Sequence, residues 1–168
     1  MSSRFPKKVS ESAVNDAPYI LFDIDLNHRG TAFGGTVMSQ ADKIAAIAAV
    51  RHSELDCVTL YVDSFKFVGP AVKGEMLIFK AAVNRVWNTS MEVGVKVLAI
   101  NPILGPRTRH VVSAYFTFVA LGPDNRPTAI PQVIPETDDE RRRFEKANLR
   151  RQRRLKEDQE DNSTKKQP

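Results

Sequence analysis

The stretch FGGTVMSQADKIAAIAAVRH, residues 33–52, decides the fold. It contains no proline and predicts one long helix. Its apolar residues do not keep to one stripe but cover most of the circumference of that helix: Phe33, Val37, Met38, Ala41, Ile44, Ala45, Ile47, Ala48, Ala49 and Val50. A helix that is apolar nearly all round is expected to be buried. Its many alanines would let a sheet close tightly around it.

Strand-forming runs flank this helix on both sides. YILFDIDL, residues 19–26, predicts a strand that ends in a loop. Four β-rich runs follow the helix between turn signals, at residues 57–68, 75–87, 90–100 and 110–121. This order predicts an α+β hotdog fold, in which a five-stranded antiparallel sheet wraps around one long buried helix. Such a sheet leaves a strand edge and a helix flank exposed, so we expect the chain to dimerise.

The rest of the chain divides around this unit. We expect a flexible N-terminus over residues 1–16, the hotdog domain over 17–125, and a proline-rich linker with a charged C-terminal helix over 126–168. Thr137 is the predicted N-cap of that helix, with Glu140 three residues later. Nine basic residues and one acidic residue lie between positions 141 and 156. We interpret them as a solvated helix face, and because no series of aromatics is interleaved for base stacking, nucleic-acid binding is not expected.

Composition narrows the function classes. The chain has 168 residues, 42% of them hydrophobic, which suits one domain with a real core. One cysteine, Cys57, forms no internal disulfide and builds no metal cluster alone. No run reaches the roughly 18 apolar residues of a membrane span, and the N-terminus has no hydrophobic signal region. We therefore expect a cytoplasmic protein with no metal site.

Asp42 is the first candidate for chemistry, because it stands mid-helix among apolar residues. Burying a carboxylate there costs several kcal/mol unless it is hydrogen-bonded or paired, or unless its pKa rises. Such carboxylates are candidates for catalysis. The alternative is a structural ion pair with Lys43 or Lys66 at the rim of the fold.

Gly34 and Gly35, in the first turn of the helix, are the second candidate. Glycine there lets a ligand approach the free N–H groups at a helix end that favours negative charge, which suits an oxyanion. Tight packing explains the pair equally well. In the preceding loop, Asn27 could hold a water or a carbonyl, and His28 could act as an acid or base; the alternatives are a turn-forming asparagine and an exposed loop histidine.

The motif NHRGTAFGGTVMSQAD, residues 27–42, resembles the acyl-CoA thioesterase (acyl-CoA hydrolase) family of the hotdog superfamily. The family pattern is matched at Asn27, Gly30, Phe33, Gly34, Gly35 and Asp42. Further similarity runs through VDSFKF from Val62, TSMEV from Thr89, SAYFTFVA from Ser113 and PQVIPETDDERRRFE from Pro131. The resemblance covers about residues 17–147.

This resemblance implies hydrolysis of a fatty acyl-CoA to a free fatty acid and CoA. It makes Asp42 the general base or nucleophile, and it places Asn27 of the partner subunit where it orients water or the thioester. The amide of Gly35, beside Gly34, would polarise the carbonyl. It implies no cofactor beyond the CoA of substrate and product, and a homo-oligomer with the dimer as catalytic unit, assembled as a hexameric trimer of dimers.

The resemblance also implies a CoA-binding region. The residues expected to contact substrate or CoA, beside Gly34, are His28, Lys66, Arg85, Asn88, Thr89 and Ser90. Many relatives have a glycine with Lys or Arg before Thr-Ser-Met, whereas this chain has Trp87-Asn88. A phosphate contact from that loop is therefore open, with Arg107 or Arg109 as substitutes.

Two other functions remain. One is a non-catalytic hotdog protein that senses acyl-CoA, against which the acid at Asp42 argues. The other is a hotdog dehydratase, with His28 and Asp42 as its catalytic pair. The Phe-Gly-Gly and Thr-Ser-Met-Glu-Val contexts favour the hydrolase.

Overall fold

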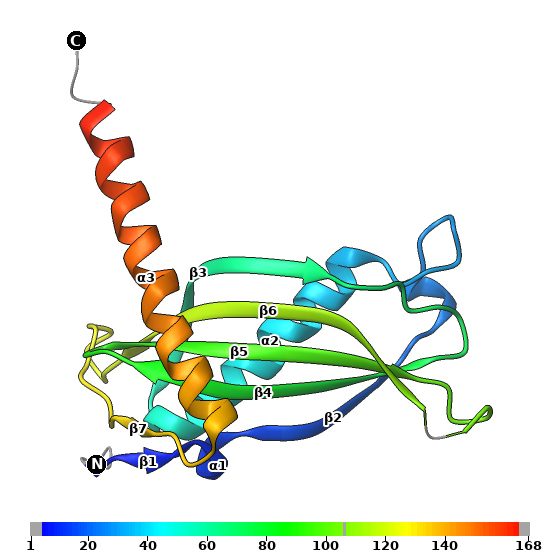
Figure 1. Ribbon diagram of the computed structural model, residues 1–168, viewed down its shortest axis with the longest axis horizontal. Helices are drawn as coiled ribbons and strands as arrows, with labels where there is room; N and C mark the ends of the chain where they lie inside the picture. The colour runs from blue at the N-terminus through cyan, green and yellow to red at the C-terminus, as the bar shows by residue number, and fades with distance from the viewer. Residues whose placement is uncertain (1–4, 106, 165–168) are drawn as a thin grey trace.

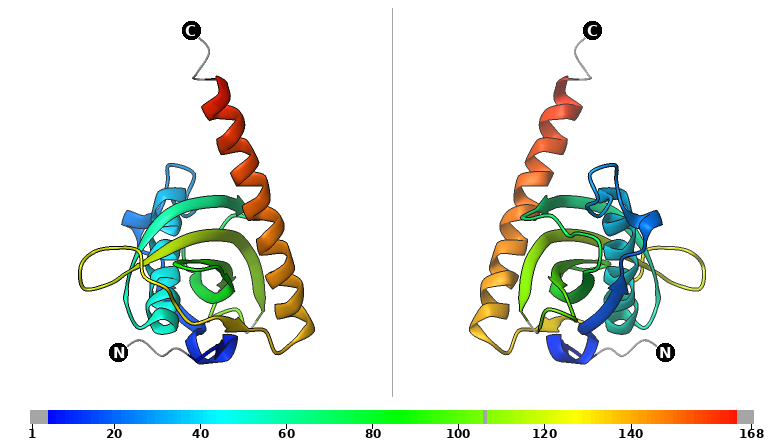
Figure 2. Two further views of the ribbon diagram at one scale, coloured as in Figure 1. Left: turned by 90° about the vertical axis from the view of Figure 1, so that its left-hand side faces the viewer. Right: turned by 90° about the vertical axis from the view of Figure 1, so that its right-hand side faces the viewer.

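A computed structural model describes residues 5–105 and 107–164 and contains the predicted α+β hotdog fold. Five antiparallel strands form one sheet in the order β2-β4-β5-β6-β3, which curves around helix α2, while helix α3 lies on its outer face (Figures 1 and 2). The sheet strands and long helices are β2 (Val14–Ile20), α2 (Gly34–Ser53), β3 (Asp56–Phe67), β4 (Met76–Val86), β5 (Ser90–Ile100), β6 (Thr108–Leu121) and α3 (Asp138–Thr164). The short elements are β1 (Lys7–Lys8), α1 (Val9–Ser12), the 3-10 turn η1 (Asp23–Asp25) and β7 (Val133–Ile134).

Small residues bring α2 close to the sheet. Four alanines of the helix are completely buried: Ala41, Ala45, Ala48 and Ala49. Alanine projects a single methyl group, so the helix backbone approaches the strands closely and large rings such as Phe79, Phe116 and Phe118 complete the core. The predicted close fit of helix and sheet is therefore present.

Helix α2 is buried on the side that faces the sheet, and the expected exposed flank is present in the single chain. Met38, Ile47 and Val50 are each 42% exposed on the flank that the sheet does not cover. β3 is an edge strand, and the side chains of Val58 and Leu60 on it are also exposed. The physical reason is that one sheet wraps only one side of a helix, so an apolar flank and an unpaired strand edge lie together at the surface.

The N-terminal segment is more regular than predicted. Residues 7–16, expected to be flexible, form β1, α1 and the start of β2, and β1 pairs with β7 inside the proline-rich linker. The first sheet strand spans Val14–Ile20 rather than residues 19–26. It ends early because the carboxylate of Asp25 accepts hydrogen bonds from the Tyr19 hydroxyl at 2.8 Å and from the Phe22 N–H at 3.0 Å, which turns residues 22–25 away from the sheet.

The C-terminal helix has the predicted start. The Thr137 hydroxyl accepts a hydrogen bond from the Glu140 N–H at 3.2 Å, and the Glu140 carboxylate accepts one from the Thr137 N–H at 2.9 Å. This reciprocal pair is a capping box, which satisfies donors that the helix itself leaves open.

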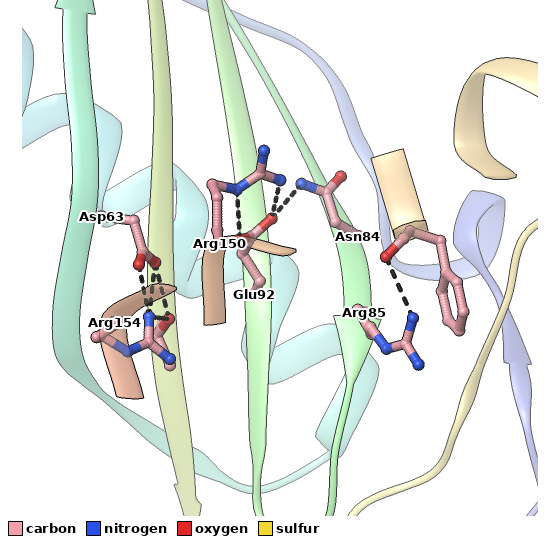
Figure 3. A network of polar contacts seen from close by, with 8 residues as sticks. Asp63, Asn84, Arg85, Glu92, Arg150 and Arg154 are labelled. Carbon is pink, nitrogen blue, oxygen red and sulfur yellow. Dashed lines mark hydrogen bonds and ion pairs between the residues drawn. The ribbon is translucent and has the colours of Figure 1, made fainter. Parts of the chain in front are cut away.

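The prediction that the arginines of this helix are solvated is wrong for three of them. Arg150 makes a two-pronged ion pair with Glu92 on β5, at 2.6 and 2.8 Å, and Arg154 pairs with Asp63 on β3 (Figure 3). Arg151 stacks on the ring of Trp87. Burial lowers the pKa of Arg150, but the ion pair with Glu92 outweighs it and raises that pKa overall. Arginines therefore fasten α3 to the sheet, because acidic partners are available on its outer face.

No helix in the described ranges has both the length and the apolar character that a membrane crossing requires.

Candidate active site

The N-terminal end of α2 presents backbone N–H groups to the surface. Phe33 is the N-cap residue, and its carbonyl accepts the first helical hydrogen bond, from the Val37 N–H at 3.2 Å. The N–H groups of Gly34, Gly35 and Thr36 precede that bond and have no helical partner. The positive end of the helix dipole lies at the same place, so this end of α2 suits a negatively charged oxygen.

A side chain at either glycine position would also meet an aromatic ring. A Cβ on Gly35 would lie 2.7 Å from a ring carbon of Phe33, and a Cβ on Gly34 would lie 3.2 Å from a ring carbon of Phe67. Larger residues would displace these rings and cover the N–H groups. The packing explanation and the ligand explanation for the glycine pair are thus compatible.

Asn27 organises the loop in front of the helix. Its side-chain oxygen accepts hydrogen bonds from the Arg29 N–H at 2.9 Å and the Thr31 N–H at 3.3 Å, and its amide donates to the Thr31 hydroxyl at 2.8 Å. Gly30 completes the turn with a φ of +72°. His28 lies exposed in the same loop. Within the chain, Asn27 therefore has the turn-forming role that the sequence left as an alternative.

Asp25 is a buried residue of this region that sequence reasoning missed. Its side chain holds Tyr19 and Phe22, and its carbonyl accepts a hydrogen bond from the Phe33 N–H at 2.7 Å. The hydrogen bond to Asp25 raises the pKa of Tyr19. Asp25 thus fixes where α2 begins. Nothing in FDIDL distinguishes it from Asp23, since the contacts depend on how the loop closes.

Asp42 lies about two turns into α2 and faces the edge strand β3. It is half-buried rather than enclosed in the core, and it accepts a hydrogen bond from the Thr59 hydroxyl at 2.7 Å. No ion pair links it to Lys43 or Lys66 within the described residues. Thr59 is the second residue that sequence reasoning missed, because a contact between a helix and a strand 17 positions apart leaves no local pattern.

The other predicted residues fall into two groups. Lys66, near the end of β3, alternates with Phe65 and Phe67 and is paired with Ser113, so it lies on the outer face of the sheet, away from Asp42. The second group is Arg85 with the β4–β5 turn, Asn88, Thr89 and Ser90, at the opposite end of the sheet from the Asn27 loop (Figure 1).

Some residues of this second group already have partners within the chain. Arg85 stacks on the ring of Phe144, 4.0 Å from its centroid, and donates a hydrogen bond to the Phe144 carbonyl. In the turn, the backbone N–H of Trp87 donates a hydrogen bond to the Ser90 carbonyl at 2.9 Å. Arg109, a predicted substitute for a phosphate contact, is paired with Glu75 at 2.8 Å. One chain therefore brings Asn27, His28, Gly34 and Gly35 together at one end of the sheet and the Arg85 group at the other, while Asp42 and Lys66 lie apart from both groups.

These features together can support attack on a carbonyl. Asp42 supplies a carboxylate whose position is fixed by Thr59, and the start of α2 supplies N–H donors for a developing oxyanion. Asp42 is the ninth residue of α2, so it lies about 12 Å along the axis from Gly34 at about 1.5 Å per residue. One small reacting group cannot touch both ends of that span from one chain.

Comparison with known proteins gives a family and close relatives. Residues 29–105 match the model of the thioesterase superfamily. The chain is 38% identical over 120 residues to the uncharacterized acyl-CoA thioester hydrolase YkhA of Bacillus subtilis, covering 71% of this chain and 69% of that one. It is 37% identical over 129 residues to mouse acyl-coenzyme A thioesterase 11, covering 77% of this chain but only 22% of that longer protein.

Solved structures agree in fold along nearly the whole chain. An asparagine-to-alanine variant of the acyl-CoA hydrolase of Staphylococcus aureus, in complex with coenzyme A, superposes with a TM-score of 0.89 at 34% identity and covers 96% of each chain. A hexameric acyl-CoA thioesterase superposes with a TM-score of 0.86 at 33% identity, covering 91% of this chain and 97% of that one.

Proposed function

Because the chain belongs to the acyl-CoA thioesterase family of the hotdog-fold superfamily, we propose that it hydrolyses a fatty acyl-CoA to a free fatty acid and CoA. The observation that carries the proposal is the placement of Asp42, half-buried on α2 and held by Thr59 at the edge strand β3. Water and the thioester suffice for this reaction, so it needs no cofactor. Relatives named cytosolic acyl coenzyme A thioester hydrolase support a cytoplasmic location.

In the proposed mechanism, Asp42 acts as general base toward water or as nucleophile toward the thioester carbonyl. The N–H of Gly35, beside Gly34, is contributed together with Asn27 by the other chain of the dimer and stabilises the oxyanion that forms when the carbonyl is attacked. Collapse of that intermediate breaks the carbon–sulfur bond and releases the CoA thiolate. The likeness to acyl-CoA hydrolases favours hydrolysis over the dehydratase alternative, in which His28 and Asp42 would be the catalytic pair.

The catalytic unit is proposed to be a dimer in which Asn27 of one chain faces Asp42 of the other. The uncovered flank of α2 and the edge of β3 supply the surface: Met38, Ile47, Val50, Val58 and Leu60 are exposed there. An unpaired edge strand of 12 residues is a ready template for a second strand. Hexameric relatives support the assembly of such dimers into a trimer of dimers.

The dimer also bears on CoA binding. Thr89 and Ser90 lie at the opposite end of the sheet from Asn27 and Gly35, so a CoA molecule that reaches both groups crosses a subunit boundary. We propose that Asn88, Thr89 and Ser90 contact the nucleotide part of CoA, with Arg85 beside them. Lys66 lies on the outer face of the sheet and His28 is exposed in its loop. We propose that both residues contact CoA that is bound mainly by a neighbouring subunit.

The activity is tested by thiol release from a panel of acyl-CoAs of increasing chain length. We expect turnover with at least one fatty acyl-CoA, with stoichiometric appearance of CoA thiol and free acid. Binding of acyl-CoA without thiol release would identify the acyl-CoA sensor instead. Release of water from a hydroxyacyl substrate without thiol release would identify the dehydratase.

Co-expression of Asn27→Ala with Asp42→Ala tests the shared site. Each homodimer lacks one partner at both of its sites, whereas a mixed dimer has one site with both residues intact. Random pairing makes half the dimers mixed, so about a quarter of all sites should be active in the mixture and about half in the purified mixed dimers. The measurement is the specific activity of tag-purified mixed dimers against each separate variant. Background activity after verified mixing would place both residues of a site in the same chain.

A further inference from the structure

A cavity of about 430 Å³ lies on the face of the sheet opposite α2. Its floor is made by β4, β5 and β6, and its wall by the first turns of α3. The charged side chains that line it are mostly basic, among them Lys80, Lys96, Arg142, Lys146 and Arg150, with Asp139 as the acidic one. The cavity is separated from Asp42 by the sheet, so it belongs to no part of the proposed active site.

Two lysines on its floor face each other directly. Lys80 on β4 and Lys96 on β5 are cross-strand partners, and both are exposed. Like charges directly opposite each other in a sheet are destabilising. Neither lysine makes an ion pair within the described ranges, and neither does Lys146 on α3; the charge of Lys96 interacts with Asp139, which already pairs with Arg142 and Arg143.

The arginines of the cavity have acidic partners, in contrast to the lysines. Arg150 is paired with the buried Glu92, which Asn84 also contacts at 2.8 Å (Figure 3). Asp139 pairs with both Arg142 and Arg143, so its single charge offsets only one of them. The ion pair with Glu92 thus neutralises Arg150, which fastens α3. The other basic residues around the cavity are three lysines, Arg142 and Arg143, and the only carboxylate that lines it among the described residues is that of Asp139.

We propose that this cavity binds an anion that carries a diphosphate. Lysine ammonium groups are compact point charges that bind phosphate oxygens. Lys80 and Lys96 hold adjacent phosphates from below, and Lys146 with Arg142 closes on them from α3. The volume lies within the range of small-ligand sites and exceeds what a single inorganic ion fills. Free diphosphates and the diphosphate of CoA share this chemistry.

Isothermal titration of the full-length protein with inorganic pyrophosphate, ADP and CoA tests the proposal. The variant is Lys80→Gln/Lys96→Gln, and the charge-matched control is Lys73→Gln/Lys156→Gln, two lysines outside the cavity lining. We expect pyrophosphate to bind the wild type and the control alike, and the affinity to fall about tenfold or more in the cavity variant, as loss of charged hydrogen bonds implies. Binding should weaken with rising salt.

The ligand series separates the two sources. If lysine-dependent binding occurs with pyrophosphate and ADP alone, free diphosphates are the ligand; if it also occurs with CoA, the CoA diphosphate shares the cavity. Equal pyrophosphate affinity in wild type and cavity variant overturns the proposal, as does absence of binding to the wild type. A lower native mass of the cavity variant would also overturn it, since the lysines would then form a contact between copies. Thioesterase turnover does not enter the readout, so failure here leaves the proposed function standing.

Discussion

Asp42→Asn lowers kcat for acyl-CoA hydrolysis by about 10²–10⁴-fold, the usual effect of losing a general base. Asparagine has the shape of aspartate, and its carbonyl oxygen still accepts the hydrogen bond that the Thr59 hydroxyl makes at 2.7 Å. It has no carboxylate to take a proton from water or to attack a carbonyl. The measurement is steady-state thiol release, together with the midpoint of thermal unfolding, which should stay close to wild type.

Thr59→Val is the companion variant to Asp42→Asn and tests whether Thr59 positions the Asp42 carboxylate. It keeps the shape of the side chain and removes only the hydroxyl that holds Asp42, so the carboxylate remains but is less well placed. We expect a smaller loss of kcat than in Asp42→Asn, with CoA affinity unchanged. A normal kcat in Asp42→Asn would contradict the catalytic assignment and leave the contact with Thr59 as a structural one.

The two catalytic roles of Asp42 differ in where oxygen from water ends up. A single turnover in ¹⁸O-water places label only in the product acid if Asp42 activates water. Attack by Asp42 itself forms an anhydride, and hydrolysis of that anhydride at the aspartyl carbon places label in the enzyme. Mass spectrometry of the peptide that contains Asp42 distinguishes the two.

The fold was predictable because its main signal is local. An unbroken apolar helix over residues 33–52, followed by four runs with strand periodicity, has few ways to be buried. The first strand was placed wrongly because Asp25 bends an apolar run that looks continuous as sequence. The early start of β2 depends on pairing with β4, more than 60 residues later.

The candidate site was predictable only where its parts are adjacent in sequence. Asn27, Gly34 and Gly35 fall within one loop and one helix turn, so a motif reveals them together. Thr59 reaches Asp42 from another element, and Asp63 reaches Arg154 across 91 positions. Tertiary contacts of this kind produce no local pattern in the sequence. The sequence of α3 alone therefore predicts solvated arginines, because their acidic partners lie on distant strands.

Glu92→Ala lowers the free energy of unfolding by about 3–5 kcal/mol, the usual cost of breaking a buried ion pair by removing one partner. Glu92 is 1% exposed and Arg150 17% exposed, so the arginine is left with a charge that water reaches poorly. Asn84 loses its acceptor as well. Chemical denaturation at fixed protein concentration gives the change, since dissociation of an oligomer contributes to the same measurement. Glu145→Ala is the control: Glu145 is 73% exposed and lies 4.0 Å from Arg85, so its loss should cost no more than about 1 kcal/mol.

A second substitution separates loss of the pair from loss of packing. In Glu92→Ala/Arg150→Met the unpaired charge is gone and an apolar chain still lies over the ring of Tyr115, which the guanidinium now covers at 3.6 Å. We therefore expect the double variant to recover much of the stability lost in Glu92→Ala, because removing both charges of a buried pair costs far less than removing one. If the double variant is as unstable as Glu92→Ala, the loss comes from the space that the glutamate filled. In that case the pair of Arg150 with Glu92 does not fasten α3 to the sheet. The ion pair of Arg154 with Asp63 and the stacking of Arg151 on Trp87 and of Arg85 on Phe144 then hold it there.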